Sequence, residues 1–264
     1  MKSFKDIVND NKYIDGHIHL FDDHKNVSMN KECIGFADVL FDRPANFSGL
    51  NMVDLYSNYI NNFLTPGTTL LATGIDADTV IGVHEKFPDI IRGFGELKCY
   101  DTYHGFDVRK GNLDWIRPVL DYNIFDLPVY IHYDMRHSRL EELDKLLEDY
   151  PTIPIVLCHC GMEMSKGGYA DGSKEIFEMV EGEMLKKDNL WVDLSWAAGN
   201  YFMDHKRELK KLPQDRIFVG TDYNPQCEVS GTTSDTYLAH MYSNACELVQ
   251  LVDSDKNIKT LFNL

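Results

Sequence analysis

The sequence lacks any apolar run of about 18 residues, the length that a membrane-spanning helix requires. Its first residues, Met1 to Asp6, also lack the apolar stretch of a secretory signal peptide. Six cysteines are present but none forms a CxxC pair, and a disulfide framework is therefore not expected. Together these absences predict a cytoplasmic protein with free thiols and no membrane partner.

Positive charge is scarce as well. The chain carries 26 Lys and Arg residues against 42 Asp and Glu residues, which gives a formal net charge of -16 at pH 7. Because such a charge repels polyanions, nucleic acid is not expected as a partner. A small-molecule substrate is expected instead, and assembly into a homo-oligomer is left open.

The 264 residues and the hydrophobic fraction of 44% are sufficient for one large α/β domain. Short apolar runs bounded by turn residues alternate with stretches of helical periodicity. Strands are predicted at 13–20, 69–75, 90–98, 128–133, 154–159, 190–194 and 216–222, and the stretch 34–40 fits either a strand or a helix. Helices are predicted at 53–64, 76–87, 112–123, 138–150, 173–187, 204–211, 234–251 and 256–262.

Strands that are separated by single helices must pair in parallel, because the chain crosses back over the sheet each time. With the stretch 34–40 as a strand, eight such units close into a (β/α)8 TIM barrel, and residues 1–264 form a single domain. The alternative is an open, doubly wound sheet. No glycine-rich phosphate loop follows the first strand, so the barrel is favoured.

The first predicted strand carries two histidines separated by one apolar residue. Successive side chains of a strand point to opposite faces, so His17 and His19 should share one face. Ile14 and Ile18 should face the other way. Two imidazoles at this spacing can bind a single cation, although the pair alone also fits a half-buried surface position.

Polar side chains recur where the other predicted strands end. They are Glu96 with Lys98, His132, His159 and Asp222. In a barrel the carboxyl ends of the strands form one ring, so residues far apart in the sequence meet in one pocket. Histidines at the ends of three separate strands, with a terminal aspartate, predict a metal site rather than core packing.

Two cysteines flank one of these histidines. Cys158 and Cys160 each lie one residue from His159. In an alternating strand both should point away from it, toward the helices. This predicts packing rather than thiolate ligation.

Four motifs, taken in order and spacing, resemble the amidohydrolase superfamily. They are Asp15-Gly16-His17-Ile18-His19, Pro128-Val129-Tyr130-Ile131-His132, Val156-Leu157-Cys158-His159-Cys160-Gly161 and Phe218-Val219-Gly220-Thr221-Asp222-Tyr223. The last motif is most similar to that of the amidohydrolase-related branch, known as amidohydrolase 2. The resemblance extends from Tyr13 to Asn224 and implies a metal-dependent hydrolase.

Residue by residue, the resemblance implies metal contacts for His17, His19, His132 and Asp222. It implies that His159 either binds a second metal or stands beside the first to polarise the substrate. Asp222 is then the catalytic residue that accepts a proton from metal-activated water and passes it to the leaving group. The expected cofactor is zinc, with manganese, nickel and iron as alternatives.

The third ligand strand leaves an alternative open. Superfamily members with two metals bridge them with a carbamylated lysine or a glutamate, and here Glu96 and Lys98 are two residues apart. We favour Glu96, whose setting also resembles the TatD-like hydrolases. The branch often works with one metal, however, and its corresponding strand carries a structural lysine. One or two ions therefore stay open, with a preference for two.

Substrate specificity should come from the loops that follow the strands. Arg136 could bind a substrate carboxylate, and the aromatic residues Tyr103, Tyr133, Trp196 and Tyr223 could line a small pocket. The same residues also fit a solvated charge and aromatic side chains packed beneath loops.

The favoured function is hydrolysis of an amide, lactone or ester bond of a small molecule by metal-activated water. One alternative is metal-dependent decarboxylation of an aromatic or unsaturated acid. A third reading is a barrel that keeps its metal but serves as a binding or structural module.

Overall fold

The computed structural model describes residues 14–20, 33–37, 51–62, 64, 67–74, 76–99, 102–103, 106–107, 113–135, 139–164, 170–171, 174–195, 201–222 and 243–264. Among the helices within these ranges, none combines the length and the hydropathy needed to cross a membrane.

Eight strands form one parallel sheet in the order β1-β2-β3-β4-β7-β8-β11-β12. Their bounds are Asp15–Leu20, Cys33–Ala37, Thr68–Ala72, Ile91–Lys98, Val129–His132, Ile155–Leu157, Leu190–Asp193 and Ile217–Phe218. Two short antiparallel pairs lie outside this sheet, β5 (Thr102–Tyr103) with β6 (Phe106–Asp107) and β9 (Glu163–Met164) with β10 (Ala170–Asp171). The stretch that fitted strand or helix is therefore a strand, β2.

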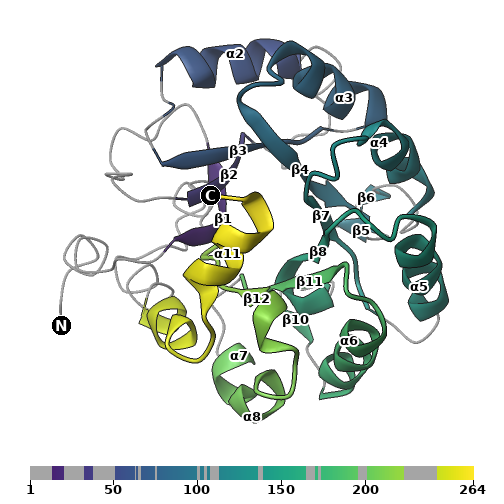
Figure 1. Ribbon diagram of the computed structural model, residues 1–264, viewed down its shortest axis with the longest axis vertical. Coiled ribbons are helices and arrows are strands. Elements are labelled where there is room, and N and C mark those ends of the chain that lie inside the picture. Colours follow the sequence, from purple (N-terminus) through teal and green to yellow (C-terminus); the bar gives the residue numbers. More distant parts are fainter. Residues whose placement is uncertain are drawn as a thin grey trace.

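Helices lie around the outside of the sheet (Figure 1). They are α2 (Met52–Asn62), α3 (Ala77–Lys86), α4 (Arg117–Tyr122), α5 (Leu140–Asp149), α6 (Lys174–Lys186), α7 (Tyr201–Asp204), α8 (Lys206–Leu209) and a helix over 243–249. The last helix, α11 (Ser254–Phe262), lies over the middle of the sheet in this view. Single turns of 3-10 helix occur at η4 (Asp114–Ile116), η6 (Cys158–Gly161) and η7 (Gln214–Arg216). The helix predicted at 204–211 begins earlier and is divided in two at His205.

The sheet is curled, and backbone hydrogen bonds join its first strand, β1, to the segment that follows its last strand, β12. The Gly16 amide donates to the Val219 carbonyl and the Asp222 amide to the His17 carbonyl, both at 2.9 Å. Gly220 permits this approach, because a Cβ atom there would lie 2.4 Å from the His17 Cβ and 2.6 Å from its backbone nitrogen. The segment 219–222, which follows β12, is therefore held against β1, the strand that carries His17 and His19.

Apolar side chains form two clusters, one on each face of the curled sheet. The outer cluster joins the sheet to the surrounding helices. The inner apolar cluster is made by one side chain from most of the strands and by the last helix: Ile14, Ile34, Leu71, Tyr130, Val156, Cys158, Trp191, Phe218, Ile258, Leu261 and Phe262. Burying each large side chain of this kind stabilises the fold by about 1.5–3 kcal/mol.

One expectation for the first strand is wrong. Ile14 and Ile18 were predicted to share a face, but Ile14 belongs to the inner apolar cluster and Ile18 to the outer one. The pairing of β1 with β2 shifts register between Asp15 and Ile18. Such an irregularity breaks the two-residue alternation of a strand, which explains the difference.

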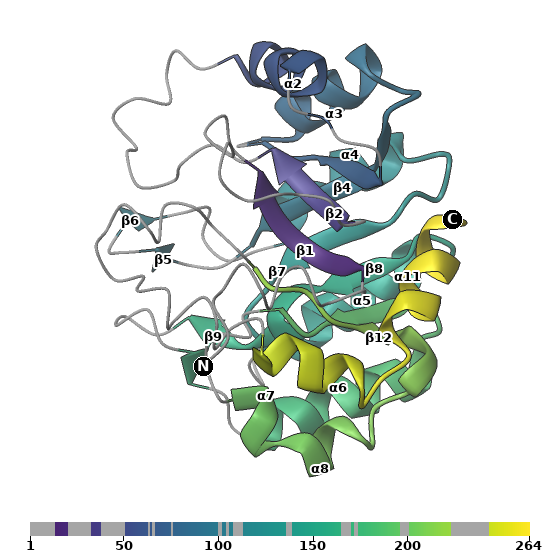
Figure 2. The same ribbon diagram turned by 90° about the vertical axis from the view of Figure 1, so that its left-hand side faces the viewer.

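The final helix, α11, covers one end of the curled sheet. Three of its polar side chains bind backbone in or directly beside β1 and β12: Asp255 Oδ1 accepts from the Ile14 amide, Ser254 Oγ from the Val219 amide, and Asn257 Nδ2 donates to the Ile217 carbonyl. Figure 2 shows α11 at one end of the molecule and the β5–β6 hairpin at the other. The carboxyl ends of the strands therefore lie at the end away from α11.

Candidate metal centre

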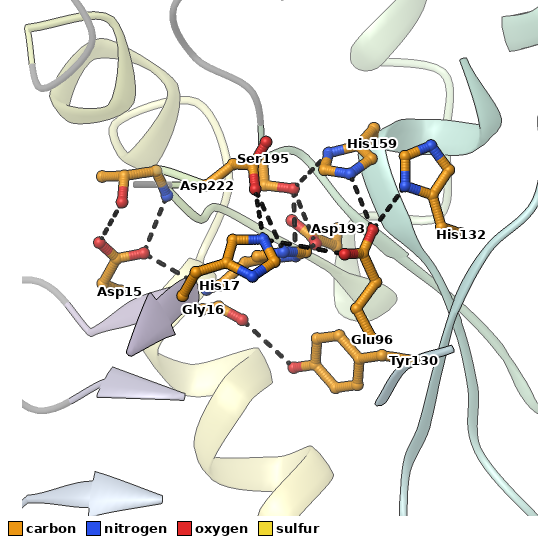
Figure 3. A network of polar contacts seen from close by, with 12 residues as sticks. Asp15, Gly16, His17, Glu96, Tyr130, His132, His159, Asp193, Ser195 and Asp222 are labelled. Atoms are coloured by element: carbon orange, nitrogen blue, oxygen red, sulfur yellow. Dashed lines mark hydrogen bonds and ion pairs between the residues drawn. The ribbon is translucent and has the colours of Figure 1, made fainter. Parts of the chain in front are cut away.

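The residues predicted as metal ligands converge at the carboxyl end of the sheet (Figure 3). They come from β1 (His17 and His19), β4 (Glu96), β7 (His132), the turn η6 after β8 (His159) and the segment after β12 (Asp222). The histidines and the glutamate are buried, and the Asp222 side chain is 8% exposed. Side chains more than 200 positions apart in the sequence therefore form one cluster, as the parallel fold requires.

On one side of this cluster, Asp222 lies against the two histidines of β1. Its Oδ1 atom is 2.9 Å from Nε2 of His19 and 3.4 Å from Nε2 of His17. Burial alone would raise the pKa of Asp222, but the nearby imidazoles of His159, His19 and His17 outweigh it and hold this pKa below its ordinary value. Asp222 is therefore a carboxylate at neutral pH.

Glu96 occupies the middle of the cluster. Its Oε1 atom is 2.5 Å from Nδ1 of His132 and 3.2 Å from Nε2 of His159. Its Oε2 atom is 3.7 Å from Nε2 of His19 and 3.6 Å from the Lys98 ammonium nitrogen. Burial alone would raise the pKa of Glu96. The charges of Lys98 and His132 outweigh this effect and hold the pKa well below its ordinary value. One carboxylate thus contacts groups from both sides of the cluster.

The donor atoms form overlapping triads. The ligand atoms of His17, His19 and Glu96 lie within 4.8 Å of one another, and so do those of Glu96, His132 and His159. A third triad joins His17, His159 and Asp222. Imidazole nitrogens and carboxylate oxygens at this spacing, with small side-chain adjustments, suit bonds of about 2.0–2.2 Å to zinc. The donor set therefore fits a divalent metal.

The electrostatics of the cluster favour positive charge. Burial lowers the pKa of His159, but the carboxylates of Asp222, Glu96 and Asp193 outweigh burial and raise it to about 9. Without a metal, the imidazole therefore holds a proton among these carboxylates. A bound cation takes the place of such a proton, because metal ligands bind in their deprotonated form.

Two of the site residues do not lie on extended strand, contrary to the predicted ranges. His159 has φ of 54° and Asp222 has φ of 55°, both in the left-handed region. β8 ends at Leu157 and β12 at Phe218, so each side chain is presented from a turn after its strand. This conformation costs a residue other than glycine about 1–2 kcal/mol, which the surrounding contacts must offset.

The same turn alters the prediction for the flanking cysteines. Cys160 packs in the outer cluster as expected, but Cys158 belongs to the inner apolar cluster. Its Sγ atom lies within 4.8 Å of ligand atoms of His17 and Asp193. The prediction for Cys158 is wrong because Cys158 continues the alternation of Val156, which also lies in the inner apolar cluster, whereas His159 is presented to the site by its left-handed conformation. Burial raises the pKa of this thiol well above its ordinary value, so it remains protonated.

The sequence interpretation missed a second set of polar residues behind the ligands. Asp15 Oδ1 accepts from the Thr221 amide at 2.8 Å and Asp15 Oδ2 from the Thr221 hydroxyl at 2.7 Å, which ties β1 to the Asp222 segment. Asp193 and Ser195 contact His17 and His159. The signal for Asp193 was present in the sequence, because it lies at the end of a strand, as His132 does, and Glu96 lies two residues before the end of its own.

The predicted substrate contacts are only partly within the described residues. Arg136, Trp196 and Tyr223 lie outside them, and Tyr103 lies in β5. Tyr133 is fully buried, and its hydroxyl donates to Glu142 Oε2 on α5 at 2.7 Å. Its ring belongs to the outer cluster. Tyr133 is therefore packed beneath a helix, and its prediction as a pocket wall is wrong.

Imidazoles and carboxylates that meet at the carboxyl edge of a parallel α/β sheet put the protein among the metal-dependent enzymes. A family comparison narrows that class. The amidohydrolase model, amidohydrolase 2, matches residues 102–248, which is more than half of the chain. The chain belongs to this amidohydrolase family and is a metal-dependent enzyme of the hydrolase type. Among curated proteins, no relative matches it.

Solved structures resemble the fold at low sequence identity. An amidohydrolase from Burkholderia multivorans with bound zinc is 12% identical, with a TM-score of 0.59 over 96% of this chain and 100% of that chain. A probable 2-pyrone-4,6-dicarboxylic acid hydrolase from Acinetobacter baumannii, with citric acid bound, is 12% identical, with a TM-score of 0.56 and the same coverage. An uncharacterised TIM-barrel protein from Bordetella bronchiseptica is 12% identical, with a TM-score of 0.50 over 88% of this chain and 74% of that chain.

Proposed function

We propose that this amidohydrolase cleaves an amide, lactone or ester bond of a small molecule by means of metal-activated water. The observation that carries the proposal is the convergence of imidazoles and carboxylates from five strand ends, with three donor triads each within 4.8 Å. The family supports hydrolysis in general, and the choice of bond is our proposal.

The proposed fold of the whole chain is a closed (β/α)8 barrel that forms one domain over residues 1–264. The backbone hydrogen bonds between β1 and the segment after β12 support closure. The likeness to a TIM-barrel protein supports the same architecture.

The residues that would hold metal are His17, His19, Glu96, His132, His159 and Asp222, and we favour two ions, to both of which Glu96 would be close enough to bind. Two triads that overlap at Glu96 support this count. The Lys98 ammonium lies 3.6 Å from Glu96 Oε2, which supports a role as the charge partner of Glu96 rather than as a carbamylated bridge. Zinc is the proposed metal, with manganese, nickel and iron as alternatives.

A bound divalent metal supplies a Lewis acid and lowers the pKa of water toward neutrality. Asp222 is a buried carboxylate beside the histidines, and we assign it as the base that accepts the proton of the attacking water. The same carboxyl then protonates the leaving group. His159, held between Glu96 and Ser195, binds metal or orients the substrate carbonyl.

The proposed substrate contacts are Arg136, which would bind a carboxylate, and Tyr103, Trp196 and Tyr223, which would line the pocket. The protein from Acinetobacter baumannii is described as a hydrolase of a dicarboxylic acid and contains citric acid. A screen should therefore begin with lactones that carry carboxylates.

The test has two stages. Metal analysis of protein purified without chelator should find at least one equivalent of zinc, manganese, nickel or iron, and a protein that cannot be loaded with any of them contradicts the proposal. Loaded protein is then screened against lactones, cyclic amides, esters and aromatic acids, with product analysis. Release of carbon dioxide without hydrolysis would establish the decarboxylase alternative instead.

A further inference from the structure

Two fully buried polar side chains lie behind the proposed ligands and are not part of the ligand set. Asp193 is the last residue of β11, and Ser195 follows two residues later. Asp193 Oδ2 is 2.5 Å from Nδ1 of His17 and 2.9 Å from the Ser195 hydroxyl. The same hydroxyl is 2.7 Å from Nδ1 of His159 (Figure 3).

The directions of these hydrogen bonds follow from the number of protons. A serine hydroxyl has one proton, and in Ser195 it is donated to the carboxylate of Asp193. The contact with His159 therefore requires the imidazole to donate from Nδ1. His17 Nδ1 faces a carboxylate oxygen, which can only accept, so this nitrogen also carries a proton.

A neutral imidazole that is protonated at Nδ1 presents a lone pair at Nε2. In both rings this second nitrogen faces the ligand cluster. His17 Nε2 is 3.4 Å from Asp222 Oδ1, and His159 Nε2 is 3.2 Å from Glu96 Oε1. The nitrogen that would bind metal is thus the one that Asp193 and Ser195 do not contact.

The position of β11 in the sheet explains how Asp193 and Ser195 contact both His17 and His159. β11 lies between β8 and β12 in the sheet. His159 follows β8, and His17 lies on β1, which is bonded to the segment after β12. Side chains at the end of β11 can therefore approach both histidines from behind.

We propose that Asp193 and Ser195 form one positioning pair that holds His17 and His159 as Nδ1–H tautomers, with both Nε2 atoms directed at the metal. This inference rests on the proposed function, because it assigns these histidines as ligands. Carboxylates that accept a hydrogen bond from a ligating histidine fix the ring and increase its basicity. Asp193 and Ser195 do not touch the substrate in this scheme.

The first test measures zinc affinity by competition with a chelator. Asp193→Asn and Ser195→Ala should each bind zinc about 10–100-fold more weakly than the wild type. Ser254→Ala is the matched control, because it also removes a buried hydroxyl, one that accepts from the Val219 amide beneath the site. This control should retain wild-type affinity even where its thermal stability falls. Wild-type affinity in both site variants overturns the inference.

The second test uses only wild-type protein, so it does not depend on whether a variant folds. NMR of wild-type protein with 15N-labelled histidine rings reports which nitrogen of each of the ten histidines carries the proton. His17 and His159 should be protonated at Nδ1 when zinc is bound, and protonation at Nε2 in either ring overturns the inference. A wild-type protein that binds no metal contradicts the proposed function. A wild-type protein that binds zinc as tightly as both site variants contradicts only the positioning pair.

Discussion

The inner face of the curled sheet has two layers that differ sharply although the same strands build both. Tyr130 and Trp191 belong to the inner apolar cluster, on β7 and β11. Two residues further along the same strands, His132 and Asp193 belong to the polar cluster. α11 covers the apolar layer, whereas the polar layer lies at the open carboxyl ends of the strands. Two residues along one face of a strand are thus enough to pass from the apolar core to the proposed metal site.

The two layers contribute in opposite directions to the free energy of folding. The apolar layer stabilises the fold through buried surface. The polar layer holds carboxylates whose pKa burial alone would raise, and it contains His159 and Asp222 in the left-handed region. Such features oppose stability and persist where the surrounding structure enforces them. Substitutions in the polar layer should therefore affect activity most, and those in the apolar layer should affect stability most.

The largest effect is expected from Asp222→Asn. The amide cannot accept the proton of the attacking water, so kcat should fall by about 10²–10⁴-fold. Steady-state kinetics on a substrate identified in the screen gives the measurement. Because Asp222 is also a proposed ligand, the kinetics are measured at a zinc concentration at which metal analysis shows that the variant is loaded. The thermal unfolding midpoint of the chelated protein shows that the variant is folded. Activity within tenfold of the wild type would contradict the assignment of Asp222 as the base.

Phe218→Ala tests the apolar layer. The Phe218 ring is fully buried, with its centroid 5.8 Å from that of Tyr130, and truncation leaves a cavity. The free energy of unfolding should fall by about 3–5 kcal/mol, as measured by urea denaturation. Phe218→Leu, which retains most of the volume, should lose less than about 1.5 kcal/mol. If the Ala variant is as stable as the Leu variant, Phe218 does not pack as the inner apolar cluster requires.

Metal removal tests whether the two layers act independently. Zinc added to chelated wild-type protein at 100 times its dissociation constant should increase the free energy of unfolding by about 2.7 kcal/mol. Phe218→Ala should show the same increment, because its cavity lies in the apolar layer. An increment that disappears in Phe218→Ala would mean that the layers are coupled, and the comparison would then fail.

The sequence was sufficient to predict the strands, the parallel sheet and the convergence of the ligand set. These features depend on local periodicity and on one topological rule, that the carboxyl ends of parallel strands lie at one edge. His17, Glu96 and Asp222 could therefore be grouped without knowing a single distance. The same rule, applied to every strand, would also have included Asp193.

Other details depend on backbone geometry that the residue pattern does not encode. The left-handed turn at His159 and Cys160 directs His159 to the site, against the strand alternation, while Cys158 stays in the inner apolar cluster with Val156. The register shift in β1 moves Ile14 to the inner face. Tyr133 looked like a pocket residue because it follows a strand, but its hydroxyl binds a glutamate on a neighbouring helix. Each departure occurs where a strand ends or is irregular.

The smallest expected effect lies outside both layers, at His84 on α3. Its ring is buried against Phe94, with the centroids 5.3 Å apart, and Nδ1 is 2.9 Å from the Tyr122 hydroxyl. Burial lowers the pKa of His84 below its ordinary value of 6.5, although Glu85 acts in the opposite direction. As the pH falls through 6.5, the unfolded chain gains a proton that the folded protein resists, and stability declines.

The variant His84→Gln removes this titration, so its free energy of unfolding should decrease less than that of the wild type between pH 8 and pH 5.5. Tyr122→Phe is the matched control, because it deletes the hydroxyl beside the ring but leaves the buried imidazole in place. It should keep the wild-type dependence on pH. Urea denaturation of the chelated proteins at both pH values gives the comparison. Equal slopes for the wild type and His84→Gln would show that the metal cluster and the surface carboxylates, rather than this outer histidine, determine the pH dependence of folding.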